Sequence, residues 1–166
     1  MTTRKKRTIL LLSLLLAGFA GSFLPGRISV TLTPSVKHRV WWLSQDTSKV
    51  RHGQYVLFHL PSSNLKGMPV PETVVNGQDI RAIKRVGCDE GETLSQKRRD
   101  FFCGDEFLGH AKETSQNGEP LTPFLFTGKI PAGEVFLVGD HPDSFDSRYF
   151  GLIEKTNYLA WARPIF

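Results

Sequence analysis

A lysine in an otherwise apolar pattern is the first residue of this chain that could do chemistry. Residues 79–86, DIRAIKRV, alternate as a β-strand does, so every second side chain points to the same face. Lys84 then shares a face with three aliphatic residues, and two arginines of the run lie opposite. Burial would lower the pKa of this lysine and leave a neutral amine, which can act as a general base. Alternatively, the amine reaches solvent from the strand or pairs with a buried acid.

A second cluster of reactive side chain types occupies residues 138–151, VGDHPDSFDSRYFG, directly after a strand-like run at 134–138. In extended chain, Ser144, Asp146 and Arg148 would share one face, because they are spaced by two residues. An aspartate–arginine pair on the surface contributes only about 0–1 kcal/mol, so its value would lie in geometry. The cluster is therefore either a solvated turn or the supporting frame of an active site.

The elements that must position these residues follow an apolar N-terminal segment. Residues 4–7 are all basic, and residues 8–25 carry no charge. A membrane helix needs about 17–25 such residues, and basic clusters stay on the cytoplasmic side. We expect a cytoplasmic tail at 1–7, a transmembrane signal-anchor at 8–26 and an exported domain at 27–166. A cleaved signal peptide with a cleavage site near residues 17–20, which would release a free periplasmic protein, is the alternative.

The charge of the chain indicates what the exported domain does not bind. The net charge is +5, and residues 4–7 supply four of the positive charges, which leaves 5 − 4 = +1 for the rest. Nucleic-acid-binding domains carry a clear excess of positive charge, so no nucleic acid partner is expected. The length of 166 residues fits one domain with a modest core.

The remainder of the chain has the pattern of an all-β protein. Short runs rich in β-branched and aromatic residues alternate with Gly, Pro, Asn and Asp, and no long helical period follows residue 26. The predicted strands are 27–32, 40–43, 54–60, 79–86, a hairpin over 93–109 that turns at 97–100, 124–126, 134–138 and 158–165. A turn-rich loop is expected at 61–77. Together these elements predict a mainly antiparallel barrel or sandwich.

Two cysteines, Cys88 and Cys103, lie in the exported domain. A disulfide between them suits an oxidising compartment and would stabilise the fold by about 3 kcal/mol in the chain-entropy model. A metal site is the alternative, but neither cysteine belongs to a CxxC pair; two buried free thiols are the third possibility. The histidines are scattered without metal-ligand spacing, at His38, His52, His59, His110 and His141. No metal or cofactor is expected.

Two stretches resemble a known family, the type I signal peptidases. Residues 79–92, DIRAIKRVGCDEGE, are similar to the strand that carries the general-base lysine of that family. Residues 128–151, GKIPAGEVFLVGDHPDSFDSRYFG, resemble its last conserved block, a Gly-Asp turn followed by Ser-x-Asp-Ser-Arg. The match is most specific for the TraF-like branch, the peptidases of plasmid conjugation systems. The resemblance runs from the apolar segment to the C-terminus, is weak at 61–77 and 93–125, and implies a signal-peptidase-like β-fold.

The resemblance also assigns roles to single residues. It implies that Ser35 is the nucleophile of a serine–lysine dyad with Lys84, and that the Ser35 N–H and the Thr33 hydroxyl stabilise the oxyanion. An ordinary threonine at a strand end is the alternative for Thr33. The chain departs from the family after the serine, where Val36 and Lys37 replace the usual Met and the Pro soon after it. For this reason two further serines, Ser29 and Ser44, stay open as the nucleophile.

The last block of the resemblance supplies the supporting residues. Ser144 would orient the lysine amine by a hydrogen bond, and Asp146 and Arg148 would form an ion pair that stiffens the site. Ser35 lies 11 residues after Leu24, so extended chain carries it about 35 Å from the membrane at most. This reach suits substrates that are themselves tethered to the bilayer.

The predicted function is that of a single-pass inner-membrane serine endopeptidase whose catalytic domain lies in the periplasm. It would process an exported precursor, a conjugative pilin, by hydrolysis or by aminolysis of the acyl-enzyme to a cyclic product, with other conjugation proteins as possible partners. A general leader peptidase is the alternative within the family. A non-catalytic pilus assembly factor is the alternative of another class. A self-cleaving repressor is disfavoured by the apolar span and the lack of a DNA-binding segment.

Overall fold

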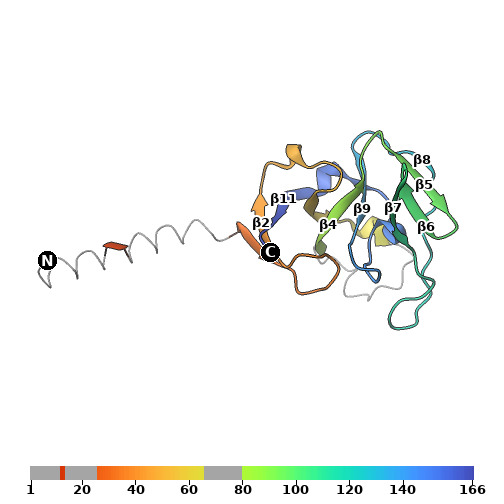
Figure 1. Ribbon diagram of the computed structural model, residues 1–166, viewed down its shortest axis with the longest axis horizontal. Helices are drawn as coiled ribbons and strands as arrows, with labels where there is room; N and C mark the ends of the chain where they lie inside the picture. Colours follow the sequence, from red (N-terminus) through yellow and green to blue (C-terminus); the bar gives the residue numbers. More distant parts are fainter. Residues whose placement is uncertain (1–11, 14–25, 66–79) are drawn as a thin grey trace, which may run out of the picture.

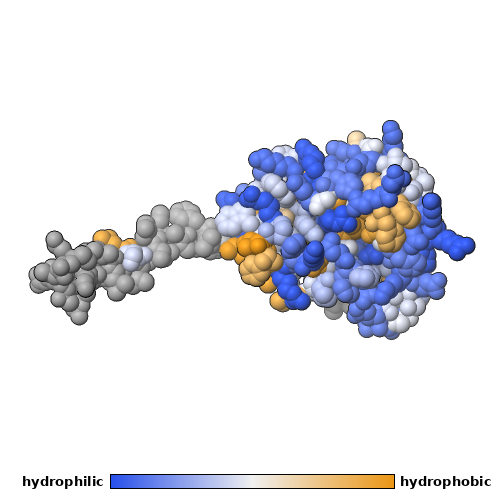
Figure 2. Space-filling view, viewed as in Figure 1, coloured by the Kyte–Doolittle hydropathy of each residue, from blue (hydrophilic) through white to orange (hydrophobic). Residues whose placement is uncertain are grey.

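The structure is a computed structural model that describes residues 12–13, 26–65 and 80–166 (Figure 1; Figure 2 shows the same view in space-filling form). Within those ranges, no helix combines the length and the apolar character that a membrane crossing needs. The predicted tail at 1–7 and almost all of the predicted span at 8–26 lie outside the described residues. The predictions for both segments therefore stay predictions.

Two antiparallel sheets make up the described domain, which confirms the all-β class. In the larger sheet the order is β1-β2-β11-β3-β4-β9-β10, and in the smaller it is β7-β6-β5-β8. The strands are β1 (Ile28–Val30), β2 (Val40–Ser44), β3 (Tyr55–Leu60), β4 (Ile80–Cys88), β5 (Thr93–Lys97), β6 (Asp100–Cys103), β7 (Glu106–His110), β8 (Gly128–Lys129), β9 (Glu134–Val138), β10 (Ile153–Glu154) and β11 (Tyr158–Pro164). The short helical turns are η1 (Thr47–Lys49), η2 (Ser62–Leu65), α3 (Ser147–Phe150) and η3 (Lys155–Asn157).

The larger sheet places the predicted lysine strand near its middle. β4 is paired with β3 on one side and with β9 on the other. In β3, every second residue is buried, as period-two alternation requires: Val56, Phe58 and Leu60. Val56 lies directly opposite Lys84 in the register of β3 and β4. The Lys84 side chain therefore extends from a strand that is hydrogen-bonded to a neighbour on each side.

The strand β9 explains how the two sheets share a core. Its successive side chains belong alternately to two groups of buried residues: Val135 and Leu137 to the group around Phe58, Phe136 and Val138 to the group of the smaller sheet. Burial on both faces accounts for the unbroken apolar sequence at this strand. The polar segment begins directly after this buried strand, at residue 139.

Most predicted strands are confirmed within one or two residues, but one is wrong. Residues 124–126 form no strand; the rings of Phe124 and Phe126 stack with centroids 6.0 Å apart, and the Phe124 N–H donates to the Arg148 carbonyl oxygen at 2.8 Å. The aromatic residues there are typical of a strand, which led to the prediction, but they lie in a loop and their rings pack against each other. The predicted hairpin over 93–109 is present as β5 and β6, and β7 adds a third strand to it.

Candidate active site

The amine of Lys84 is buried and held by a serine. Lys84 is 4% exposed, and its Nζ donates to the Ser144 hydroxyl oxygen at 2.6 Å. Burial lowers the pKa of Lys84 to about 8, against the attraction of the Asp146 carboxylate and with the help of the Arg148 charge. Neither of the ordinary alternatives for this lysine holds, because its amine does not reach solvent and its close partner is a hydroxyl group.

A glycine makes room for this contact. A Cβ atom on Gly139 would lie 2.0 Å from the Ser144 Oγ and 2.5 Å from the Ser35 carbonyl oxygen, which is closer than atoms can approach. The backbone at 139 therefore touches both the serine that holds the lysine and the residue predicted as nucleophile. The Ser144 N–H donates to the His141 carbonyl oxygen at 2.9 Å and closes the turn.

Ser35 lies at the tip of the loop that connects β1 and β2. The base of this loop is closed by the Thr31 N–H, which donates to the Arg39 carbonyl oxygen at 2.9 Å. At the tip, the His141 N–H donates to the Ser35 carbonyl oxygen at 3.3 Å. The Ser35 and Thr33 hydroxyl oxygens are 3.4 Å apart, so the threonine can place a donor beside the Ser35 hydroxyl. Thr33 is thus in a loop and not at the end of a strand.

The other two candidate serines lie elsewhere. Ser29 is in β1 opposite Trp41, and Ser44 ends β2 opposite Trp161. Neither lines the cleft that Ser35 and Lys84 share. The geometry therefore favours Ser35 among the three serines.

The shared cleft has a volume of about 400 Å³ and mostly apolar walls. Its apolar side chains come from β3, β4 and the segment around α3: Leu60, Ile80, Ala82, Phe145 and Phe150. Its polar lining includes Ser35, Lys84 and Ser144. Such a cleft can hold apolar side chains of a peptide beside a nucleophile and a base.

Asp146 and Arg148 form a buried ion pair and not a surface pair. They are 0% and 2% exposed, and the guanidinium donates to both carboxylate oxygens at 2.8 and 2.7 Å. Burial acts to lower the pKa of Arg148, but the hydrogen bonds and charge of Asp146 outweigh it and raise the pKa. The extended geometry expected for this segment is wrong, because Asp146 caps the helical turn α3. Arg148 still reaches back and donates to the Ser144 carbonyl oxygen at 3.1 Å.

Asp140 is a site residue whose contacts the sequence did not indicate. Its Oδ2 accepts hydrogen bonds from the Lys37 N–H and the Tyr55 hydroxyl, both at 2.8 Å. These partners lie 103 and 85 residues away along the chain, so no local pattern could reveal them.

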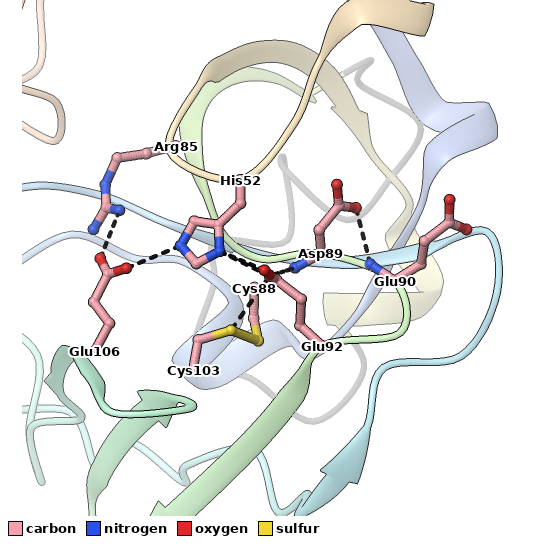
Figure 3. The surroundings of a disulfide bond; sticks show 8 residues. All are labelled: His52, Arg85, Cys88, Asp89, Glu90, Glu92, Cys103 and Glu106. Atoms are coloured by element: carbon pink, nitrogen blue, oxygen red, sulfur yellow. Dashed lines mark hydrogen bonds and ion pairs between the residues drawn. A yellow bond between two sulfur atoms is a disulfide. The ribbon is translucent and has the colours of Figure 1, made fainter.

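The structure joins Cys88 and Cys103 in a disulfide bond (Figure 3). Within the described ranges, His52, Glu92 and Cys103 form the one group of potential metal ligands whose donor atoms lie close together. The Cys103 sulfur is used by the disulfide, and the His52 ring lies between the carboxylates of Glu92 and Glu106 at 2.9 Å each. His52 is therefore close to Cys103 in space, but its ring is paired with the carboxylates of Glu92 and Glu106.

The whole chain apart from its first four residues matches one protein family. The model of this family, described as signal peptidase, peptidase S26, covers residues 5–166. The chain belongs to this family and is a serine endopeptidase of the signal peptidase I type.

Individual relatives agree with the family. A conjugal transfer protein TraF from Agrobacterium fabrum is 29% identical over 161 residues, which are 92% of this chain and 90% of the relative. Signal peptidase I V from Bacillus subtilis is 31% identical over 157 residues, 83% of this chain and 93% of the relative. A solved signal peptidase I from Enterococcus faecalis is similar at 23% identity and a TM-score of 0.40, over 68% of this chain and 96% of that structure.

Proposed function

We propose that Ser35 is the nucleophile and Lys84 the general base of a membrane-anchored endopeptidase that cuts an exported, pilin-like precursor. The observation that carries this proposal is the buried amine of Lys84, held by Ser144 in the cleft that Ser35 lines. A neutral amine in that position can take the proton of a serine hydroxyl.

The proposed reaction has two covalent stages. Neutral Lys84 accepts the proton of Ser35 as the Ser35 Oγ bonds to the carbonyl carbon of the scissile peptide. The oxyanion is stabilised by the Ser35 N–H and the Thr33 hydroxyl. Lys84 then returns the proton to the leaving amine as the C–N bond breaks, and an ester to Ser35 remains.

The acyl-enzyme is resolved by a second nucleophile. With water, Lys84 accepts a proton as the water oxygen bonds to the acyl carbon, and it returns that proton to the Ser35 Oγ as the ester bond breaks and a free carboxyl end is released. With the amino terminus of the same substrate, the amine nitrogen bonds to the acyl carbon, Lys84 passes its proton to the Ser35 Oγ as the ester bond breaks, and the new peptide bond closes the product into a ring. The intact mass distinguishes the two products, because the cyclic one is lighter by one water.

The substrate class and the location rest on the relatives and the N-terminal sequence. The name of the Agrobacterium relative contains conjugal transfer, which supports a precursor of a conjugation system. We assign residues 1–7 to the cytoplasm, 8–26 to the inner membrane and 27–166 to the periplasm, in keeping with the basic and apolar composition of the first 26 residues. Other conjugation proteins would be partners there.

The dyad is tested with alanine variants in a strain that carries the membrane-bound precursor. Ser35→Ala and Lys84→Ala should abolish processing, whereas the control variants Ser29→Ala and Ser44→Ala should process normally. Cleavage by either dyad variant at the wild-type rate would refute the proposal. Mass spectrometry of the product decides between hydrolysis and ring closure.

The pH dependence provides a test of the lysine alone. With a pKa of about 8, roughly one molecule in ten carries a neutral Lys84 at pH 7, and the fraction rises above that pH. The rate of precursor cleavage should therefore increase with pH and level off above about pH 8. A rate that still climbs towards pH 10 would show an unshifted lysine.

A general leader peptidase is the second candidate, because the chain is 31% identical to signal peptidase I V of Bacillus subtilis. Expression in a cell depleted of its own leader peptidase separates the two. Growth rescue would support the general enzyme, and cleavage restricted to one conjugative precursor would support the dedicated one.

A further inference from the structure

The tip of the loop that carries Ser35 is held by the buried side chain of Val36, which packs in the core with Trp41, and by two hydrogen bonds to the segment after β9. Thr31 and Arg39 close its base, and the strands β1 and β2 continue from there. Among the described residues, two backbone groups near the tip are bonded to the segment that follows β9. The Ser35 carbonyl oxygen accepts from the His141 N–H at 3.3 Å, and the Lys37 N–H donates to Asp140 at 2.8 Å.

The Asp140 contact is the shorter of the two, and it depends on how the carboxylate is oriented. The same Oδ2 that binds the Lys37 N–H also accepts the Tyr55 hydroxyl at 2.8 Å. The other oxygen, Oδ1, faces the Arg85 Nε at 3.5 Å. A carboxylate on a turn can rotate about its side chain bonds, and two donors on the same oxygen restrict that rotation.

Tyr55 is well placed to restrain the carboxylate because its ring is itself fixed. The ring centroid lies 4.9 Å from that of buried Trp41. It also meets the His38 ring, which belongs to the Ser35 loop, edge to face at 6.0 Å. Burial and the neighbouring Asp140 carboxylate raise the pKa of Tyr55, so its hydroxyl stays a donor throughout the working range of pH.

From these contacts we infer that Tyr55 is a positioning residue for the nucleophile, which acts through the Asp140 carboxylate on the Lys37 N–H. The inference rests on the proposed role of Ser35. It gives β3, through Tyr55, the task of restraining the Ser35 loop, which neither the dyad nor its supporting residues perform. Tyr55 touches no reacting atom; it limits how far the tip of the loop departs from the geometry needed for attack.

The test removes a single oxygen atom. Tyr55→Phe keeps the ring and loses the bond to Asp140, so kcat for precursor cleavage should fall about tenfold while KM stays within about twofold. Tyr158→Phe is the matched control, because the Tyr158 hydroxyl is buried and has no hydrogen-bond partner within the described structure. This control should cleave at the wild-type rate.

A second variant asks whether the effect runs through Asp140. Asp140→Ala should lower kcat at least as much as Tyr55→Phe, and adding Tyr55→Phe to it should cost nothing more. Additive losses in the double variant would overturn the inference, as would a rise in KM at unchanged kcat.

A measurement that needs no substrate separates this inference from the proposed dyad. Hydrogen exchange at the Lys37 amide should be about tenfold faster in Tyr55→Phe than in the wild type and unchanged in Tyr158→Phe. Unchanged exchange together with wild-type kcat in Tyr55→Phe overturns the inference even if Ser35→Ala is inactive. Continued cleavage by Ser35→Ala overturns the dyad, while faster exchange would still place Tyr55 in control of the loop.

Discussion

The two sides of the proposed dyad are held in opposite ways. On the lysine side, Lys84, Ser144, Asp146 and Arg148 are each no more than 4% exposed. On the serine side, Ser35 is half-buried, the two residues before it are exposed, and Val36 directly after it is buried. The difference follows from the chemistry, because the base needs a dry environment to stay neutral, whereas the nucleophile must stay open to a peptide chain.

The contacts on the two sides also differ in range along the chain. The frame of the lysine is built within the segment 139–148, where Asp146 accepts from the Gly139 N–H at 2.8 Å and pairs with Arg148. The serine loop depends on partners about a hundred residues away, such as Asp140 for Lys37. The frame of the base is therefore local within itself, although Lys84 reaches it from a strand 60 residues earlier, whereas the Ser35 loop has partners about a hundred residues away.

Removing the buried amine should have the largest effect on activity. Lys84→Met should reduce precursor cleavage by at least about 10³-fold, because the base is lost. The variant should also unfold at a higher urea concentration, because a buried amine is replaced by an apolar side chain of similar length. Lys129→Met, at an exposed position of β8 away from the cleft, is the control and should change neither quantity by much. An active Lys84→Met enzyme would contradict the assignment of the base.

Removing the acid of the buried ion pair should have the next largest effect. Asp146→Ala leaves the Arg148 charge without its partner in the core and should lower the free energy of unfolding by about 3–5 kcal/mol. Asp46→Ala removes a partner of the solvent-exposed pair with Lys49 and serves as the control. Urea denaturation of both variants checks the difference. Similar midpoints for the two would mean that the core pair is not structural.

A substitution at the junction of the two sides should have an intermediate effect. In Gly139→Ala the new methyl group collides with the Ser144 hydroxyl and the Ser35 carbonyl group. We expect a loss of about 1–3 kcal/mol in stability and a 10- to 100-fold slower cleavage. Gly118→Ala, whose methyl group enters open space but whose backbone φ of +83° strains an alanine, is a control for cleavage only. Normal cleavage by Gly139→Ala would show that the loops can separate without cost.

The smallest expected effect concerns the corner beside the disulfide. Burial acts to lower the pKa of His52, but the carboxylates of Glu92 and Glu106 outweigh it and raise the pKa above its usual 6.5. The stabilising contribution of His52 is thus full below about pH 6.5 and is lost as pH rises through the raised value. Urea unfolding at pH 5.5 and 8.5 should show a difference between wild type and His52→Gln that shrinks at the higher pH, by less than about 1 kcal/mol. A difference that grows with pH would contradict the direction of the pKa shift.

Local patterns in the sequence predicted the lysine side well. The burial of Lys84 follows from the alternation of one strand, although Ile83 on the opposite face is buried as well. The same logic failed at Arg148, because a single aspartate at 146 caps a helical turn and ends the extended conformation. It failed again at Phe124, where the aromatic ring packs against Gly151 in a loop.

The serine side could not be predicted in the same way. The hydrogen bonds of Asp140 with the Ser35 loop and with Tyr55 form only when β2, β3 and the segment after β9 come together in the fold. Its position in a family pattern indicated Ser35 as the nucleophile. The tertiary structure adds the hydrogen bonds that hold its loop. Contacts between distant segments depend on the whole sheet and leave no mark in any short stretch of sequence.

The order of strands in the larger sheet has a consequence for the timing of activity during biosynthesis. Within the described residues, β2 joins the rest of the larger sheet only through β11, which lies between β2 and β3. A ribosome completes β11 after all of these other strands, so a nascent chain can already contain the lysine strand and its frame while the serine hairpin still has no place in the sheet. The enzyme would then remain inert while it is being made, and it would become competent only when its last strand has docked.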